Sequence, residues 1–198
     1  ADDARRHLAL AHEQLRAATV RLVVVGGGPG TGKSTLARAL ADHAEAQVIS
    51  TDEVRRELVQ SGAVTGVSGV LNAGLYHPDK VAVVYDVVLD RAADLLARGR
   101  SVILDGTWRD ATQLQRARTI AAKCTCPTVE LECVVPLEAA QRRIAGRTNT
   151  TSEVTPQIAA AMAHDERVRP GAHPIDTSRP LADSVAEAVA VCQVNDTP

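Results

Sequence analysis

Short apolar runs alternate with longer amphipathic segments along most of the chain. Four short runs rich in Val, Ile and Leu predict buried strands at residues 21–25, 48–49, 101–104 and 128–135, and residues 174–177 are predicted to be the last strand. Between them, apolar residues recur at the spacing of a helix with one buried face. These segments cover residues 33–44, 52–60, 78–98, 110–123, 137–147 and 181–194, and Pro156 opens a further predicted helix.

Strands that alternate with helices predict an α/β fold with a five-stranded parallel sheet and helices on both faces. The crossovers between strands should be right-handed. Residues 61–77 contain four glycines without periodicity, so we predict a mobile connection there. Residues 4–18 have helical spacing. We therefore divide the chain into a lead-in helix, residues 1–19, and one domain, residues 20–196.

The composition narrows the class of protein. Among 198 residues, 22 Lys+Arg and 24 Asp+Glu give a formal net charge of -2, which argues against a nucleic-acid-binding surface. Aromatic residues make up 2%, so the core must be aliphatic. No apolar run approaches the ~18 residues of a membrane span, and the polar start has no signal-peptide character. We expect a cytoplasmic protein without membrane contact, with four reduced, structural cysteines.

A glycine-rich segment follows the first predicted strand and contains the Walker A pattern G-x-x-x-x-G-K-S, from Gly27 to Ser34. Glycines let the backbone wrap around a phosphate, and the following helix presents the positive end of its dipole. Lys33 would reach the β- and γ-phosphates of ATP, and Ser34 would ligate Mg²⁺. The predicted ATP-binding residues are Gly28, Pro29, Gly30, Thr31, Gly32, Lys33, Ser34 and Thr35. The alternative is a glycine-rich turn without a ligand.

Asp52 follows the second predicted strand, at the carboxyl edge where open α/β sheets bind ligands. Its carboxylate could accept a proton from an acceptor hydroxyl during phosphoryl transfer. Arg55, one turn further on, could hold an anionic or polar acceptor. The alternative is structural, because Ser50 and Glu53 match a capping box at the start of a helix.

The third predicted strand ends in Asp105, which could orient Mg²⁺ through water beside the phosphate loop. Apolar strands that end in Asp are common, so a purely structural role is the alternative. Trp108, the single Trp, and Arg109 come next and are candidates for the acceptor pocket. Trp108 could equally be a packing residue.

Arg143 and Arg147 are four residues apart and share one face of a predicted helix. Their charges could offset the negative charge that develops during phosphoryl transfer. A solvated basic face is the alternative. A polar run over residues 148–152 follows and suits a moving segment.

These motifs, in this order, resemble small bacterial P-loop kinases: the kinase part of 5′-polynucleotide kinases, chloramphenicol phosphotransferase, zeta-type toxins and gluconate-kinase-like enzymes. The resemblance covers residues 20–194 and rests on the phosphate loop, Ser-Thr-Asp-Glu-Val-Arg, Ser-Val-Ile-Leu-Asp-Gly-Thr-Trp and Arg143-x-x-x-Arg147. It implies that Asp52 is a general base and that Arg55 contacts the acceptor. It also implies that Arg143 and Arg147 belong to a lid over about 137–155.

The chain also resembles the C-terminal half of fusion proteins that begin with an aminoglycoside-phosphotransferase-like domain. A start at Ala1 rather than Met suits such a partner domain, on which the lead-in helix would pack. Should the donor be ATP, the predicted loop Thr177-Ser178-Arg179 would lie near adenine, as loops after the last strand do in such folds.

Several functions use these residues. The first is transfer of the γ-phosphate of ATP·Mg²⁺ to a hydroxyl of a small-molecule acceptor. The second is a kinase for nucleic-acid 5′ ends, which the three aromatic residues and the acidic net charge weaken. The third is an ATP-gated regulatory module without catalysis, and the fourth is a toxin that acts on a nucleotide sugar. The acceptor is not specified by any motif in the sequence.

Overall fold

The computed structural model describes residues 2–66, 74–146 and 169–194. The helices are α1 (Asp2–Ala18), α2 (Lys33–Ala44), α3 (Thr51–Gln60), α4 (Pro78–Ala97), α5 (Ala111–Lys123), α6 (Leu137–Ala145) and α8 (Leu181–Val194), with a 3₁₀ turn, η1, at Gly74–Tyr76. The strands are β1 (Leu22–Gly26), β2 (Gln47–Ser50), β3 (Val102–Asp105), β4 (Thr128–Val134) and β5 (His173–Asp176). The predicted helix from Pro156 lies outside the described residues.

The strands form one five-stranded sheet in the order β2-β3-β1-β4-β5, and every pair is parallel. This confirms the predicted α/β fold. The register places Val25 of β1 opposite Asp105 of β3, and Gly26 opposite Glu132 of β4. Parallel strands end at the same edge of a sheet, so the loops that follow β1, β2 and β3 converge there.

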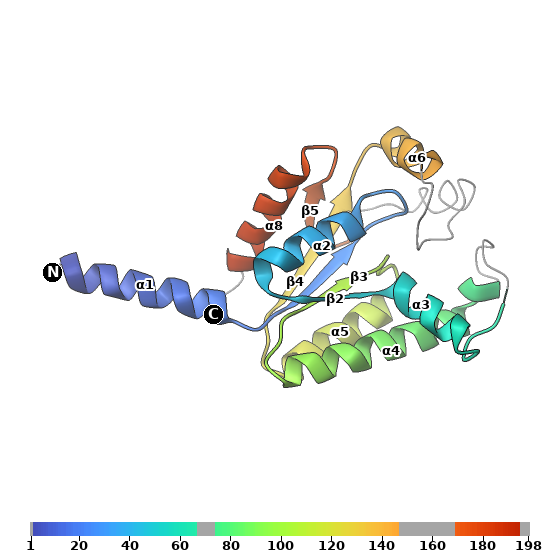
Figure 1. Ribbon diagram of the computed structural model, residues 1–198, viewed down its shortest axis with the longest axis horizontal. Helices are drawn as coiled ribbons and strands as arrows, with labels where there is room; N and C mark the ends of the chain where they lie inside the picture. The colour runs from blue at the N-terminus through green and yellow to red at the C-terminus, as the bar shows by residue number, and fades with distance from the viewer. Residues whose placement is uncertain (1, 67–73, 147–168, 195–198) are drawn as a thin grey trace.

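Helices cover both faces of the sheet, with α2 and α8 on one face and α4 and α5 on the other (Figure 1). Side chains of β1 alternate between two buried clusters: Leu22 and Val24 pack toward α4 and α5, and Val23 and Val25 toward α2 and α8. A strand buried on both faces reads as a continuous apolar run, which is why β1 could be found from sequence.

Local chemistry sets the helix ends near the predicted positions. The ring of His77 accepts a hydrogen bond from the backbone N–H of Asp79 at the start of α4, and Pro78 occupies the first helical position. Gly99, at φ 72°, follows the end of that helix. At α5, the Asp110 carboxylate accepts from the backbone N–H of Thr112 at 2.8 Å.

The lead-in helix α1 projects away from the sheet and its covering helices (Figure 1). The side chains of residues 3–11 are all exposed, including Leu8 at 72%.

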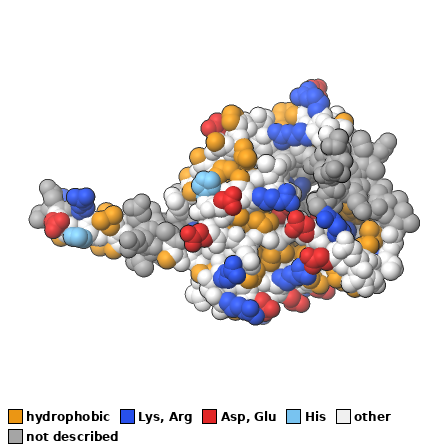
Figure 2. All heavy atoms as spheres, viewed as in Figure 1, with side chains coloured by type: hydrophobic (Ala, Val, Ile, Leu, Met, Phe, Trp, Pro, Cys, Tyr) orange, Lys and Arg blue, Asp and Glu red, His pale blue; other side chains and the backbone are white. Residues whose placement is uncertain are grey.

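In Figure 2, positive and negative side chains are interspersed over the face in view, in line with the small net charge. Within the described ranges, none of the helices has the length and apolar character that a membrane crossing requires.

Candidate active site

The glycine-rich segment forms a tight loop between β1 and α2. The hydroxyl of Thr31 donates to the carbonyl of Gly28 at 2.9 Å, and the Lys33 ammonium reaches back to the same oxygen at 2.8 Å. Gly30 and Gly32 have φ angles of 80° and 87°, which L-residues with a Cβ rarely adopt. The loop therefore has the glycine-dependent curvature that the Walker A pattern predicts.

The loop is packed against its neighbours. A Cβ on Gly27 would lie 2.7 Å from the carbonyl oxygen of Cys133, after the middle of β4. A Cβ on Gly30 would lie 2.6 Å from the carbonyl oxygen of Ala140 in α6. The loop backbone therefore lies close to β4 at Gly27 and close to α6 at Gly30, and neither position has room for a side chain.

Ser34 and the buried Asp105 form a pair beside this loop. The Ser34 hydroxyl donates to Asp105 Oδ2 at 2.7 Å, and Asp105 is 3% exposed. Burial raises the pKa of Asp105, and the Lys33 charge and the Ser34 hydrogen bond offset part of that rise. Asp105 Oδ1 is buried without a hydrogen-bond partner in the described part of the chain. A hydroxyl and a carboxylate with a free oxygen are ligands that suit Mg²⁺.

Asp52 is the second residue of α3, at the same edge of the sheet. Its Oδ1 atom pairs with Nη1 of Arg55, and the Asp52 side chain is 30% exposed while that of Arg55 is 11% exposed. The Arg55 guanidinium also lies over the ring of Tyr76, 4.8 Å from its centroid. The carboxylate is thus held in place by Arg55 yet accessible.

The predicted capping box at this helix does not form. Ser50 occupies the N-cap of α3, but its side chain makes no capping hydrogen bond; the hydroxyl lies beside Asp105 and favours its charged form. Glu53 pairs with Arg38 at 3.0 Å instead of turning back to the cap. The capping-box alternative is therefore wrong in its hydrogen bonds, although Asp52 does lie in the first turn of α3, where an acidic residue favours a helix start.

Trp108 lies in the core. It is 1% exposed, packs edge-to-face on Tyr85 with ring centroids 5.0 Å apart, and its indole N–H donates to the carbonyl of Leu104 at 3.3 Å. The alternative of a packing residue therefore describes Trp108, and the prediction that it lines the acceptor pocket is corrected. Arg109 is exposed directly after it, and its contact with an acceptor stays a prediction.

Arg143 reaches from α6 to the phosphate loop. Its Nη1 atom donates to the carbonyl of Gly30 at 3.5 Å, and Nη2 donates to the carbonyl of Thr177 at 2.7 Å. The Thr177 hydroxyl in turn donates to the carbonyl of Thr31 at 2.6 Å. Arg143 therefore joins α6, the loop and the segment after β5. Arg147 and most of the predicted lid lie outside the described residues.

A pocket of about 400 Å³ opens between the phosphate loop, α6 and the start of α8. Its lining residues are Gly30, Gly32, Thr35, Leu36, Arg143, Thr177, Arg179, Leu181 and Ser184. Two of the three residues predicted to lie near the donor base, Thr177 and Arg179, are among them. Leu181 and Ser184 were not predicted, because a helix start after a short edge strand carries no motif.

The sequence did not predict a second group of residues, which are charged side chains near the start of the phosphate loop. Glu132 of β4 pairs with Arg169 at 2.5 Å, and both side chains are nearly buried, at 12% and 13% exposed. The pair lies beside Gly26, at the start of the loop. Glu130 and Glu132 alternate with apolar residues in β4, and two carboxylates on one face of an interior strand are a signal that could have found them.

The fold and this loop together define a P-loop nucleotide-binding domain of the kind found in small kinases. The chain belongs to the family described as "AAA domain", whose model matches residues 22–168. An adenylate kinase of Salinispora tropica is 35% identical over 131 residues, which are 65% of this chain and 58% of that protein.

A longer relative and two solved structures extend this comparison. An uncharacterized protein of Mycobacterium tuberculosis (strain ATCC 25618 / H37Rv) is 47% identical over 188 residues, which are 95% of this chain and 38% of that protein. This chain thus spans well under half of that relative. A gluconokinase of Sinorhizobium meliloti 1021 superposes with a TM-score of 0.63 at 17% identity, covering 87% of this chain and 91% of that one.

The APS kinase CysC of Mycobacterium tuberculosis, solved in complex with AMPPNP and APS, superposes with a TM-score of 0.65 at 17% identity. The superposition covers 87% of this chain and 97% of that one. At such low identity these two structures show a shared fold, and the reaction of this chain has to be argued from its own residues.

Proposed function

We propose that this chain is a phosphotransferase that moves the γ-phosphate of ATP·Mg²⁺ to a hydroxyl group of a small-molecule acceptor. The observation that carries the proposal is the shared position of Asp52, the Ser34–Asp105 pair and Lys33 at one edge of the sheet. A nucleotide-binding module without catalysis has no need of an accessible carboxylate held by a buried arginine at that edge.

Each side chain would have a separate task. Lys33 and the backbone N–H groups of the loop would bind the β- and γ-phosphates. Ser34 and Asp105 would hold Mg²⁺, which neutralises phosphate charge when bound. The pocket beside Arg143 and Thr177 has a volume, about 400 Å³, that suits an adenine ring and its ribose.

Asp52 would accept the proton of the acceptor hydroxyl. As that proton leaves, the acceptor oxygen forms a bond to the γ-phosphorus, and the bond from phosphorus to the β–γ bridging oxygen breaks to release ADP. The ion pair with Arg55 orients the Asp52 carboxylate before the reaction. Arg55 Nε is buried without a hydrogen-bond partner among the described residues, which supports its use as a donor to a polar acceptor group.

The test is a transfer assay with γ-labelled ATP and Mg²⁺ over sugars, nucleosides, aminoglycosides and oligonucleotides. We expect the wild-type chain to label one class of small molecule, and Lys33→Met to abolish that labelling. Lys123→Met is the matched control, because Lys123 is exposed at the far end of α5 and should leave transfer unchanged. Nucleotide binding without transfer to any acceptor would overturn the proposal and support the regulatory module; labelling of oligonucleotides alone would replace the acceptor class.

A further inference from the structure

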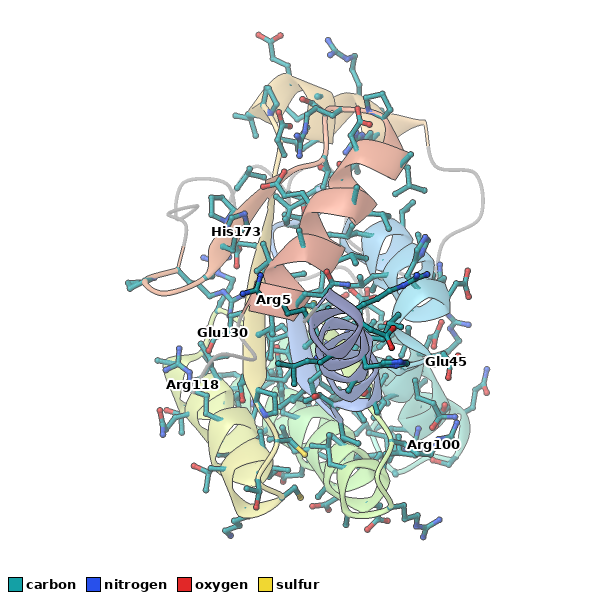
Figure 3. The ribbon with its side chains drawn as sticks, turned by 90° about the vertical axis from the view of Figure 1, so that its left-hand side faces the viewer. Arg5, Glu45, Arg100, Arg118, Glu130 and His173 are labelled. Carbon is teal, nitrogen blue, oxygen red and sulfur yellow. The ribbon has the colours of Figure 1, made fainter. Side chains whose placement is uncertain are left out.

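Four charged side chains form a linked network on one side of β4, in which Arg118 is 41% exposed and the other three side chains are 8–13% exposed. Arg118 of α5 donates to Glu130 at 2.6 Å, and Arg169 donates to Glu132 at 2.5 Å (Figure 3 labels Arg118 and Glu130). Arg169 Nη1 lies 3.8 Å from Glu130 Oε2, so the two pairs are linked. Two nearly buried carboxylates on one strand are costly, and each needs a cationic partner.

The Arg169–Glu132 pair lies against the phosphate loop. Glu132 is opposite Gly26 in the sheet register, and its Oε2 atom would lie only 2.6 Å from a Cβ placed on Gly26. Arg169 Nη2 also donates to the carbonyl of Leu131 at 3.3 Å, which ties the guanidinium to the backbone of β4. The pair therefore lies beside Gly26, the last residue of β1 before the phosphate loop.

The charge of Lys33, like that of Arg169, acts on the Glu132 carboxylate. Burial raises the pKa of Glu132, and the charges of Arg169 and Lys33 counteract that rise. In a poorly solvated site, an unpartnered carboxylate would attract the nearest ammonium strongly. Lys33 instead donates to the carbonyl of Gly28 at 2.8 Å, over the centre of the loop.

We propose that Arg169 is a positioning residue that occupies the Glu132 carboxylate and so keeps the Lys33 ammonium available for phosphate. Without Arg169, Glu132 would compete with the nucleotide for Lys33 and would place an uncompensated negative charge beside the polyphosphate. The inference rests on the proposed function, because it takes Lys33 to be the phosphate ligand. It adds a residue and a role that the phosphate-loop pattern does not contain.

The test is a calorimetric titration of the full chain with ADP and with AMPPNP. Arg169→Gln should weaken binding by about tenfold or more, since a competing buried carboxylate is released. Glu132→Gln should bind like the wild type. The double variant Arg169→Gln/Glu132→Gln should recover to within about threefold of the wild type, because the competitor is gone.

Arg118→Gln is the matched control. It also removes a cationic partner from a carboxylate of the same network, Glu130, so it should lower the unfolding temperature as Arg169→Gln does. It should leave nucleotide affinity unchanged, because it frees no carboxylate beside the loop. Equal losses of affinity in Arg118→Gln and Arg169→Gln would overturn the proposal in favour of a general loss of stability.

A spectroscopic readout separates positioning from structure. The chain has three lysines, Lys33, Lys80 and Lys123, so the Lys33 ammonium can be assigned by NMR in ¹⁵N-lysine-labelled protein. Its resonance should move in Arg169→Gln, return in the double variant and stay in place in Arg118→Gln. An unmoved resonance in a folded Arg169→Gln would contradict the proposal.

Two outcomes keep this inference distinct from the proposed function. Should the wild-type chain bind no nucleotide, the proposed function fails first. Should the wild type bind and Arg169→Gln bind equally well, only the role of Arg169 fails.

If Arg169→Gln does not fold, Glu132→Gln decides, since a tenfold loss of affinity there would show that Glu132 supports the site rather than competing with it.

Discussion

Asp52 and Asp105 lie at the same edge of the sheet in different surroundings. Asp105 is 3% exposed and bonded to Ser34, whereas the Asp52 side chain is 30% exposed and paired with Arg55. Two carboxylates in contrasting environments are a common way to divide roles within one site. The buried one fits a metal ligand, and the accessible one fits a proton acceptor.

Asp52→Asn removes the proposed proton acceptor and keeps the shape of the side chain. We expect kcat for transfer to fall by about 100-fold or more, with nucleotide affinity nearly unchanged. Steady-state kinetics and calorimetry measure the two quantities. Glu53→Gln is the control, because its carboxylate pairs with Arg38 on the surface. Undiminished transfer in Asp52→Asn would remove the assignment.

Asp105→Asn should raise the stability of the ligand-free protein and at the same time lower its transfer activity. A carboxyl group with a raised pKa in the folded state favours folding below its unfolded pKa, near 3.8, and that contribution is lost as pH rises through the folded pKa. At neutral pH the charged form therefore lowers the stability of the ligand-free protein. We expect Asp105→Asn to unfold about 2–4 °C higher, for roughly 1 kcal/mol, and to lose Mg²⁺-dependent transfer.

Thermal unfolding without nucleotide or Mg²⁺ tests this, and the gain should shrink as pH falls. A lower unfolding temperature at neutral pH would show that Lys33, Ser34 and Ser50 stabilise the charged form by more than burial destabilises it.

The phosphate loop and α6 are packed as one unit. The carbonyl of Ala140 faces Gly30, and Arg143 bonds both to Gly30 and to Thr177 after β5. A change in α6 should therefore reach the loop without touching the Walker A residues.

Gly30→Ala tests this contact. The added Cβ would lie 2.6 Å from the Ala140 carbonyl oxygen at a φ of 80°, so both a clash and backbone strain are expected. Gly62→Ala is the matched control, because its φ is 76° and nothing lies within 4 Å of the added carbon. We expect Gly62→Ala to cost about 1 kcal/mol. Gly30→Ala should cost about 1–3 kcal/mol more and also weaken nucleotide binding. Equal unfolding free energies in the two variants would show that α6 yields to the loop.

The molecule as a whole consists of a rigid sheet between two helical layers and one helix that stands apart. Both buried clusters are almost wholly aliphatic, which agrees with a composition of 2% aromatic residues. The described side chains of α1 add little to either cluster, since residues 3–11 are exposed. The division into a lead-in helix and a domain over 20–196 stays a prediction.

Removal of residues 1–18 tests that division. The described side chains of α1, residues 3–11 and Ala18, are exposed, so we expect the unfolding temperature to change by less than about 2 °C and nucleotide affinity to stay the same. Differential scanning calorimetry of the shortened and full chains measures the first quantity. A drop of more than about 5 °C would show that α1 supports the domain.

Periodicity predicted the elements of the fold because residues that share the buried face of a helix or strand recur at a fixed spacing along the sequence. Leu36, Ala37 and Leu40 recur at helical spacing and form the buried face of α2. The order of the strands was not predictable in this way. That β1 lies between β3 and β4 depends on contacts between residues far apart in sequence.

The phosphate loop could be predicted from the sequence alone. Its glycines let the backbone curve around a phosphate and its lysine binds that phosphate, and both recur at a fixed spacing whatever surrounds them. The positions of Trp108 and Arg143, and the pairing of Glu132 with Arg169, were decided by tertiary structure. Each depends on which side chain lies across a strand register or a helix contact. Such partners are brought together only when the sheet has formed, and no local pattern records them.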